Sequence, residues 1–315
     1  MNDIALLIHG PRSTFTTQVI TQACRALKSG QIAHAIFAGY EADLPAISAQ
    51  IGALDSALLG RFSLISAPDV SNPGIANLNR QINLVNAALA AIGSTDLVIK
   101  LRSDQCCSFR DCLFQIARFS QDLQAGKLLT TNCYTRSDRL YHPSDMFLIA
   151  TPDTLRTYYP QQLFPQTQLD DLLAIGQDVA DGASLAQMQQ WPEARLFRHL
   201  LTRRGWTPLE TPADSSNALR AHCIILDARQ IGLRWEKFYL GRIPLVPYRF
   251  HVAPFPKLPE EDCRCVRAAD FGACPNGLSN RTEWLTRLLW HRNLDALRMR
   301  GDWKATIRTI LGINA

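Results

Sequence analysis

Four short, largely apolar runs, each ending abruptly in polar or Gly/Pro-containing sequence, constrain what this chain can fold into. They cover residues 4–8, 33–39, 62–66 and 97–101. Runs of about five apolar residues without alternation are typical of strands that are buried on both faces, as in a parallel sheet. The runs therefore predict a parallel sheet in the first hundred residues.

Helical segments separate these runs. Apolar residues recur at helical spacing after Ser13, which can cap a helix, and again over residues 77–92. Strands that alternate with helices predict an α/β fold, with a mostly parallel sheet flanked by helices. Ligands of such sheets bind outside the carboxyl ends of the strands. Three polar segments fall there, at residues 9–13, 69–74 and 102–105.

The rest of the chain continues with mixed elements. We expect helices at residues 109–119, 152–159 and 193–202, strands at 128–132, 146–150 and 222–226, a loop at 207–217, and two amphipathic helices within 280–312. We predict a first domain at residues 1–205, which would hold the ligand and the candidate site residues discussed below, and a helical C-terminal extension at 206–315. Packing of both parts as one domain is equally consistent with the sequence.

Composition excludes several classes of protein. Of the 315 residues, 47% are hydrophobic and 19% are charged, which favours a packed core over disorder. The net charge of +5 suits a partner that carries phosphates but predicts no nucleic-acid partner. The N-terminus does not resemble a secretory signal, and no apolar run is long enough to span a bilayer. We therefore expect a cytoplasmic protein whose nine cysteines are reduced.

Asp104 follows a predicted buried strand that carries Lys100 and Arg102 on one side. A carboxylate at this place matches the position where GT-A nucleotide-sugar transferases hold a divalent metal, which bridges the diphosphate of the donor. Those enzymes usually carry Asp-x-Asp, whereas this chain has one acid between Ser103 and Gln105, so a surface turn is the alternative. Two cations on the same side favour an anion pocket over a solvated turn.

Two further segments are candidates for donor binding. Gly10 and Pro11 would let the backbone approach a ribose closely, and Ser13 could offer a hydroxyl, although Gly-Pro after a strand is also ordinary turn chemistry. Asn79 and Arg80 lie in the first turns of a predicted helix, where anions are favoured, and a capped surface helix is the alternative. Neither a GxGxxG nor a GxxxxGKS/T loop occurs, so dinucleotide oxidoreductases and P-loop proteins lose their main support.

Asp145 and Glu193 are the candidate catalytic acids. Asp145 precedes a predicted strand and could face the same cleft as Asp104, as a general base or an orienting residue. The alternative is an ordinary turn of the Pro-Ser-Asp kind. Glu193 follows Pro192 at a helix start, which is favourable N-terminal helix chemistry that needs no function.

The C-terminal third adds two weaker patterns. Cys263, Cys265, Cys274 and His251 invite a zinc interpretation, but their spacing matches no zinc motif. Residues 281–308 carry seven Lys/Arg against three acids, with tryptophans interleaved. A basic amphipathic helix of this kind suits an anionic membrane surface, and a helix packed on the core is the alternative.

Taken together, several separated segments resemble the WavE family of lipopolysaccharide-synthesis proteins. The resemblance covers roughly residues 4–200 and lies in the order and approximate spacing of the motifs. These are Gly10-Pro11, Asn72-Pro73-Gly74, Asn77-Leu78-Asn79-Arg80-Gln81-Ile82, Ile99-Lys100-Leu101-Arg102-Ser103-Asp104-Gln105, Tyr141-His142-Pro143-Ser144-Asp145-Met146-Phe147 and Pro192-Glu193.

That resemblance implies a GT-A-like sugar transferase of bacterial surface-polysaccharide assembly. It implies a nucleotide-sugar donor, a glycan or lipid-linked acceptor, and work at the cytoplasmic face of the inner membrane. The basic pattern of the C-terminal helices, which lie outside the resemblance, predicts peripheral membrane contact. By the same resemblance Asp104 would bind a divalent metal (Mn²⁺ or Mg²⁺), and Asp145 and Glu193 would be acceptor-side acids. It also implies that Arg80, Lys100 and Arg102 hold the donor phosphates. Together with the residues singled out above, the candidate donor-binding residues are Gly10, Pro11, Ser13, Asn79, Arg80, Lys100 and Arg102.

We therefore hypothesise a glycosyltransferase of lipopolysaccharide or capsule biosynthesis. A non-catalytic GT-A-like partner in a polysaccharide-assembly complex is the alternative, since the incomplete acid motif would then mark a degenerate site. A nucleotidyltransferase that makes the activated sugar shares the phosphate chemistry and would bind a nucleoside triphosphate.

Overall fold

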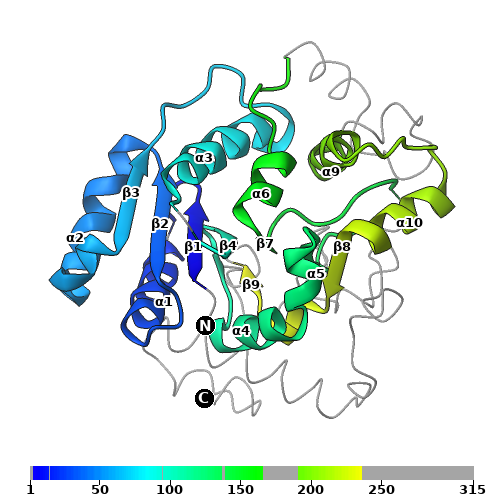
Figure 1. Ribbon diagram of the computed structural model, residues 1–315. Coiled ribbons are helices and arrows are strands. Elements are labelled where there is room, and N and C mark those ends of the chain that lie inside the picture. The colour runs from blue at the N-terminus through cyan, green and yellow to red at the C-terminus, as the bar shows by residue number, and fades with distance from the viewer. Residues whose placement is uncertain (1–2, 14, 94, 137–138, 166–190, 236–315) are drawn as a thin grey trace, which may run out of the picture.

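A computed structural model describes residues 3–13, 15–93, 95–136, 139–165 and 191–235 (Figure 1). A seven-stranded sheet has the strand order β3-β2-β1-β4-β7-β6-β8. The strands are β1 (Ile4–His9), β2 (His34–Gly39), β3 (Phe62–Ser66), β4 (Leu97–Arg102), β6 (Leu128–Thr131), β7 (Leu148–Ala150) and β8 (Cys223–Leu226). Within this sheet β7 runs antiparallel to both neighbours and the other pairs are parallel. The predicted mostly parallel sheet is confirmed.

Helices cover both faces of the sheet (Figure 1). The first face packs against α1 (Thr16–Lys28), α2 (Leu44–Leu54), α4 (Phe109–Arg118) and α5 (Ser120–Gln124). The second face packs against α3 (Leu78–Ala91), α6 (Pro152–Tyr158), α9 (Pro192–Arg203) and α10 (Pro212–His222). Single-turn 3₁₀ segments are η1 (Glu41–Asp43), η2 (Ser56–Gly60), η3 (Ile75–Asn77) and η5 (Ala228–Ile231), and β5 (Gln105–Cys106) pairs with β9 (Arg234–Trp235).

Alternation along β4 decides which side chains reach the candidate site. Leu97, Ile99 and Leu101 belong to the core under the first face, whereas Val98 belongs to the core under the second. Because successive side chains of a strand point to opposite faces, Lys100 and Arg102 share the second face with Val98. This arrangement agrees with the strand parity that the sequence predicts for the two cations.

Three helices of the described residues, α2, α5 and α10, were not expected from the sequence. Residues 207–217 were predicted to be a loop, but α10 begins at Pro212, so that prediction is wrong for the second half of the segment. The Thr211 hydroxyl caps the helix by accepting from the Asp214 backbone N–H at 3.1 Å, and Pro at the first helical position fits a helix start. Helices α2 and α5 also lacked a prediction.

The C-terminal extension is described in part. Strand β8, which follows residue 205, forms an edge of the same sheet, next to β6. Residues 236–315 lie outside the described residues, as do the cysteines near 263 and the basic helices near 281–308, so the division at residue 205 stays a prediction. No helix among the described residues has the length and apolar character needed to cross a membrane. The six cysteines of the described part are buried.

Candidate functional site

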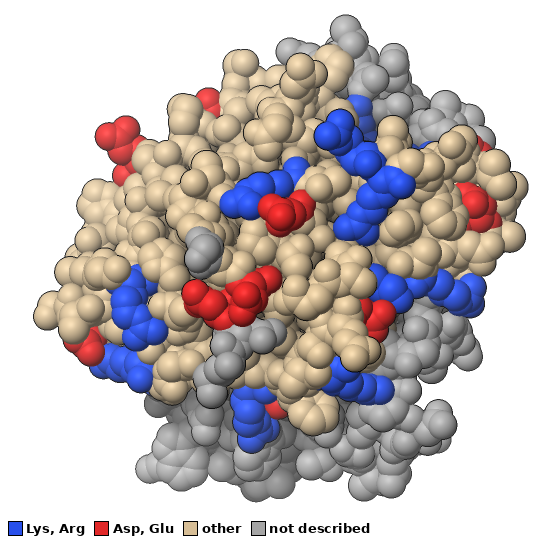
Figure 2. All heavy atoms as spheres, in the orientation of Figure 1, with Lys and Arg blue, Asp and Glu red and all other residues tan. Residues whose placement is uncertain are grey.

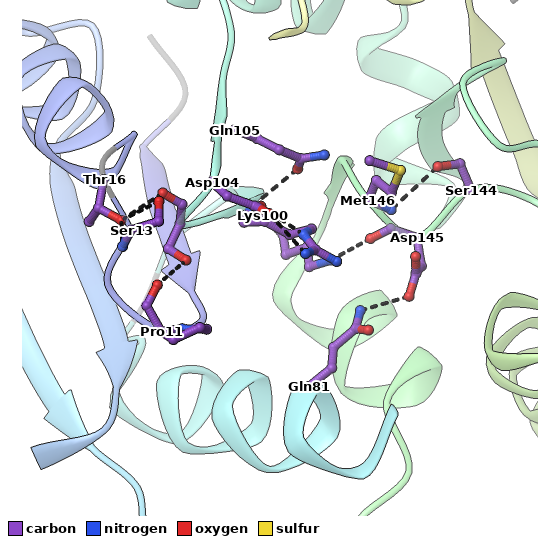
Figure 3. Close-up of polar contacts among 12 residues, drawn as sticks. Pro11, Ser13, Thr16, Gln81, Lys100, Asp104, Gln105, Ser144, Asp145 and Met146 are labelled. Atoms are coloured by element: carbon purple, nitrogen blue, oxygen red, sulfur yellow. Dashed lines mark hydrogen bonds and ion pairs between the residues drawn. The ribbon is translucent and has the colours of Figure 1, made fainter. Parts of the chain in front are cut away.

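Lys100 lies at the centre of the candidate site, which is built at the carboxyl ends of β1 and β4. Its side chain is fully buried, and its ammonium donates to the backbone carbonyl of Asp145 (Figure 3). The ammonium also lies 5.9 Å from the centre of the Tyr159 ring. Burial lowers the pKa of Lys100 to about 8, and the nearby Asp145 carboxylate opposes that shift. Lys100 is therefore a fixed, buried cation at neutral pH.

Arg102 and Asp104 form a two-point ion pair nearer the surface. The Nε and Nη2 atoms of Arg102 donate to the two carboxylate oxygens of Asp104 at 2.9 and 3.0 Å. Their side chains are 35% and 16% exposed, so a ligand can approach this pair, unlike Lys100. Burial alone would lower the pKa of Arg102, but the hydrogen bonds and charge of Asp104 outweigh it and the pKa is raised.

Asp145 is held from helix α3. The side-chain amide of Gln81 donates to Asp145 Oδ2 at 2.7 Å (Figure 3). It also donates to the Tyr159 hydroxyl at 3.1 Å. The preceding residue is tied to the sheet, because the Thr130 hydroxyl donates to the Ser144 carbonyl at 2.7 Å. The Asp145 residue is 7% exposed. The carboxylate is thus fixed in direction and close to Lys100.

Glu193 begins helix α9 beside His142. The two side chains approach within 3.3 Å between His142 Nε2 and Glu193 Oε2, and the glutamate side chain is 18% exposed. Burial raises the pKa of Glu193, the charge of Asp145 raises it further, and Arg139 and Arg136 oppose the shift. An acid with a raised pKa and some access to solvent is suited to proton transfer near neutral pH.

The loop after β1 packs directly on the turn after β4. Gly10 has φ +124°, and a Cβ at this position would lie 2.6 Å from Ser103 Oγ, so both backbone shape and space favour glycine. Ser103 Oγ donates to the Pro11 carbonyl at 2.7 Å, and Thr16 Oγ1 donates to the Ser103 carbonyl at 3.0 Å. The same threonine hydroxyl accepts from the Ser13 N–H at 2.8 Å. These bonds place the candidate donor loop beside Asp104.

His9 joins the site as the last residue of β1. It is paired in register with Arg102 and is 5% exposed. Burial lowers the pKa of His9 well below its usual value, and the charges of Lys100 and Arg102 lower it further. Within the part of the chain that the structure describes, His9 Nε2 has no hydrogen-bond partner. His9 is therefore a neutral side chain in a positive field.

Asn79 and Arg80 are engaged elsewhere. The buried Asn79 amide accepts from the Phe164 N–H at 2.9 Å and donates to the carbonyls of Phe164 and Asn72 at 2.9 and 3.1 Å. Arg80 makes a two-point ion pair with Asp69 at 2.8 and 2.6 Å. Of the predicted site residues, the structure gathers Gly10, Pro11, Ser13, Lys100, Arg102, Asp104, Asp145 and Glu193.

Four residues of the site had no role assigned from the sequence. They are His9, Gln81, His142 and Tyr159. The polar His9 at the end of an apolar run is a signal that could have been used. For Tyr159 the local sequence carries no signal, because its place depends on how α6 packs against β4 and α3.

The site is a cluster of opposite charges. Lys100 and Arg102 enter it from β4, and the carboxylates of Asp104, Asp145 and Glu193 surround them. Figure 2 shows Lys and Arg atoms near the middle of one face of the molecule, with acidic atoms directly beside them and more basic atoms to the right. The two cations of the site can bind an anionic group, and its carboxylates can accept hydrogen bonds or a proton.

The residues present do not fit the predicted divalent metal at Asp104. Mn²⁺ and Mg²⁺ are bound through oxygen ligands, mostly carboxylates, waters and phosphates. Among the described residues no three or more His, Cys, Asp or Glu side chains are grouped to hold a metal. In addition, both oxygens of Asp104 accept hydrogen bonds from Arg102.

Comparisons with known proteins give only distant structural likeness. No protein-family model and no curated protein matches the sequence. Galactosyltransferase LgtC in complex with donor and acceptor sugar analogues is similar at a TM-score of 0.35 and 11% identity, over 71% of this chain and 74% of that chain. Glucosyl-3-phosphoglycerate synthase of Mycobacterium tuberculosis, in complex with Mn²⁺, UDP and glucosyl-3-phosphoglycerate, gives 0.36 and 14%, over 66% and 82%. Mannose-6-phosphate isomerase of Helicobacter pylori gives 0.34 and 9%, over 55% and 77%. At these TM-scores the likenesses carry no argument about function.

Proposed function

We propose that the chain is a glycosyltransferase that moves a sugar from a nucleotide-sugar donor to a glycan or lipid-linked acceptor. One observation carries the proposal. The glycine-containing loop after β1, two cations of β4, an acid from the loop before β7 and an acid from the first turn of α9 meet at the carboxyl ends of a mostly parallel sheet. Open α/β sheets bind their ligands at this edge.

The cations provide the donor side. Arg102 is partly exposed and would contact the diphosphate directly, whereas the buried Lys100 would act through its field. Charged donors fixed in advance stabilise negative charge as it develops on a leaving group. Gly10, Pro11 and Ser13 would let the nucleoside lie close to the backbone of the first loop.

The acids provide the acceptor side. In an inverting transfer the base removes the proton of the acceptor hydroxyl, and that oxygen attacks the anomeric carbon. The bond between this carbon and the diphosphate oxygen breaks, and the diphosphate leaves with the electron pair beside Arg102. We assign the base to Glu193, because its side chain reaches solvent and its pKa is raised. Asp145, held by Gln81, would position the acceptor.

The cellular role follows from the sequence resemblance. The motifs shared with the WavE family support membership of that family and a role in lipopolysaccharide or capsule assembly at the cytoplasmic face of the inner membrane. Asn79 and Arg80 remain proposed donor-side residues. Asn79 would act by holding the backbone at Phe164, and Arg80 would act from the edge of the donor site. None of these steps involves the metal that the resemblance implies, because both carboxylate oxygens of Asp104 accept hydrogen bonds from Arg102.

Thermal-shift measurements with nucleoside diphosphates and nucleotide sugars would test this proposal. A ligand that binds the folded state raises the midpoint of unfolding by mass action. We expect stabilisation by at least one nucleoside diphosphate, and its loss in Arg102→Gln. Stabilisation by none of them would favour a non-catalytic partner protein, and stabilisation by a triphosphate alone would favour a nucleotidyltransferase. Release of nucleoside diphosphate from the stabilising nucleotide sugar would then show transfer or hydrolysis.

A further inference from the structure

Asp104 binds an arginine at the place where the sequence predicts a metal ligand. Both of its carboxylate oxygens accept from Arg102, at 2.9 and 3.0 Å. A two-point pair of this kind fixes the plane and direction of the guanidinium. A metal at Asp104 would have to share these oxygens with a guanidinium already bound to them. The geometry therefore makes Asp104 a residue that orients a cation of the chain itself.

The surroundings of the pair are positive on the side of β4. The Lys100 side chain is fully buried on the same face of the strand, and its ammonium is fixed by the Asp145 carbonyl. His9 lies opposite Arg102 in the register of β1 and β4, and burial, reinforced by the charges of Lys100 and Arg102, lowers its pKa well below the usual value. Lys100 and Arg102 would both repel a divalent cation at Asp104, and both would attract a diphosphate.

We propose that the site binds a nucleoside diphosphate without a divalent metal, with Arg102, oriented by Asp104, in the place of the cation. This inference rests on the proposed function and specifies its donor site. In this arrangement Asp104 is a positioning residue that acts through Arg102. Lys100 supplies a second positive charge behind the guanidinium. Lys100 and Arg102 of β4 thus supply the positive charge that a metal would bring.

Affinity measured with and without free metal tests the inference. Binding of UDP, GDP, CDP and ADP to the full chain is measured by calorimetry, in excess EDTA and in excess Mg²⁺ or Mn²⁺. We expect Kd for the best of the four to change by less than about twofold between these conditions. Arg102→Gln should weaken binding about ten- to a hundredfold in both, because a charge-assisted contact is lost.

A conservative variant distinguishes the orienting role of Asp104 from a role as a metal ligand. Asp104→Asn keeps the shape of the side chain, weakens its hold on Arg102, and should raise Kd by about tenfold whether or not metal is present. Asp153→Asn is the matched control, because Asp153 pairs with Arg156 on an exposed helix surface at 3.0 Å. It should leave Kd unchanged. Circular dichroism of each variant checks that it is folded.

Three results would overturn the inference, and they distinguish its failure from the failure of the proposed function. If EDTA raises Kd tenfold or more and Asp104→Asn removes this dependence, Asp104 binds a metal and the inference fails while the proposed function stands. Manganese bound by the chain in the absence of nucleotide, seen by electron paramagnetic resonance and lost in Asp104→Asn, would lead to the same conclusion. If none of the four nucleotides binds in either condition, the proposed function itself is wrong.

Discussion

The ammonium of Lys100 and the backbone carbonyl of Asp145 are joined by a hydrogen bond across 45 residues of sequence. It connects the buried end of β4 to the loop that leads into β7, and so brings a cation and an acid into one site. The arrangement is costly, because a charged amine is removed from water and only partly compensated. Its cost should be visible in how stability depends on pH.

Lys100→Met should change the pH dependence of unfolding. The pKa of Lys100 is lowered from 10.5 to about 8 in the folded chain, so between these values the folded state releases a proton that the unfolded state keeps. The penalty for burying Lys100 is therefore full below pH 8 and disappears as the pH approaches 10.5. We expect the stability of wild type relative to Lys100→Met to rise by roughly 3 kcal/mol over that window.

Urea unfolding of both proteins at a series of pH values measures this difference. Taking the difference between the two proteins cancels other titrating groups, including the buried tyrosines. Asp145, Arg102, Asp104 and Glu193 also act on Lys100 and are present in both proteins. Lys28→Met, at an exposed ion pair with Asp55, controls for loss of a lysine. Unfolding curves that stay parallel at all pH values would contradict a buried, perturbed Lys100.

The strand pattern was predictable from the sequence because it is local. Residues 97–101 are apolar except for Lys100, and period-two alternation suffices to place Lys100 and Arg102 on one face. The start of α10 was also signalled, since Thr211 and Pro212 form a helix start, but the Ser, Asp and Asn residues that follow favoured a loop.

The contacts within the site were not predictable in the same way. Gln81 meets Asp145 over 64 residues of sequence, and Asn79 meets Phe164 over 85. Such pairs depend on strand order and on how α3 and α6 pack, and no local pattern encodes either. The same holds for Arg102 and Asp104. From two residues apart these side chains could pair with each other, or Asp104 could bind a metal, and the local sequence does not distinguish the two arrangements.

Glu193→Gln should remove the main pH dependence of transfer. The pKa of Glu193 is raised by burial and by Asp145, so as a base it becomes active only as the pH rises through a value above the usual range for glutamate. We expect kcat/KM of wild type to rise with pH in this range, and the variant to be at least about a hundredfold slower with a flat profile. Initial rates of nucleoside diphosphate release over the pH range measure this.

Asp145→Asn is the companion variant for this experiment. If Asp145 positions the acceptor, its loss should lower kcat/KM but leave a pH-dependent limb, shifted to lower pH because a negative charge next to Glu193 is gone. A flat profile in Asp145→Asn together with a retained limb in Glu193→Gln would assign the base to Asp145 instead.

Gly10→Ala should damage the donor loop. The new Cβ would lie 2.6 Å from Ser103 Oγ and the backbone would keep φ +124°, which costs about 1–3 kcal/mol of stability in a residue with a side chain. The midpoint of thermal unfolding and the affinity for nucleoside diphosphate should both fall. Gly60→Ala is the control, because a Cβ there meets nothing within 4 Å. Ser103→Ala removes the contact but also the hydrogen bond to the Pro11 carbonyl, so Gly10→Ala/Ser103→Ala is compared with Ser103→Ala alone. Equal stability of these two variants would show that the backbone conformation contributes little.

Asn79→Ala separates a supporting role from direct contact with a donor. The fully buried amide satisfies the N–H and the carbonyl of Phe164, and its loss leaves these groups without their partner. An unsatisfied buried polar group costs about 1–3 kcal/mol, so we expect a loss of roughly 2–4 kcal/mol in urea unfolding. Asn83→Ala, one turn further along the same helix and bonded to the Pro68 carbonyl at the surface, should cost less than about 0.5 kcal/mol.

If Asn79 acts through the Phe164 segment, the nucleoside diphosphate affinity of folded Asn79→Ala should stay within about threefold of wild type. A loss of tenfold or more with unchanged stability would instead place Asn79 in contact with the donor.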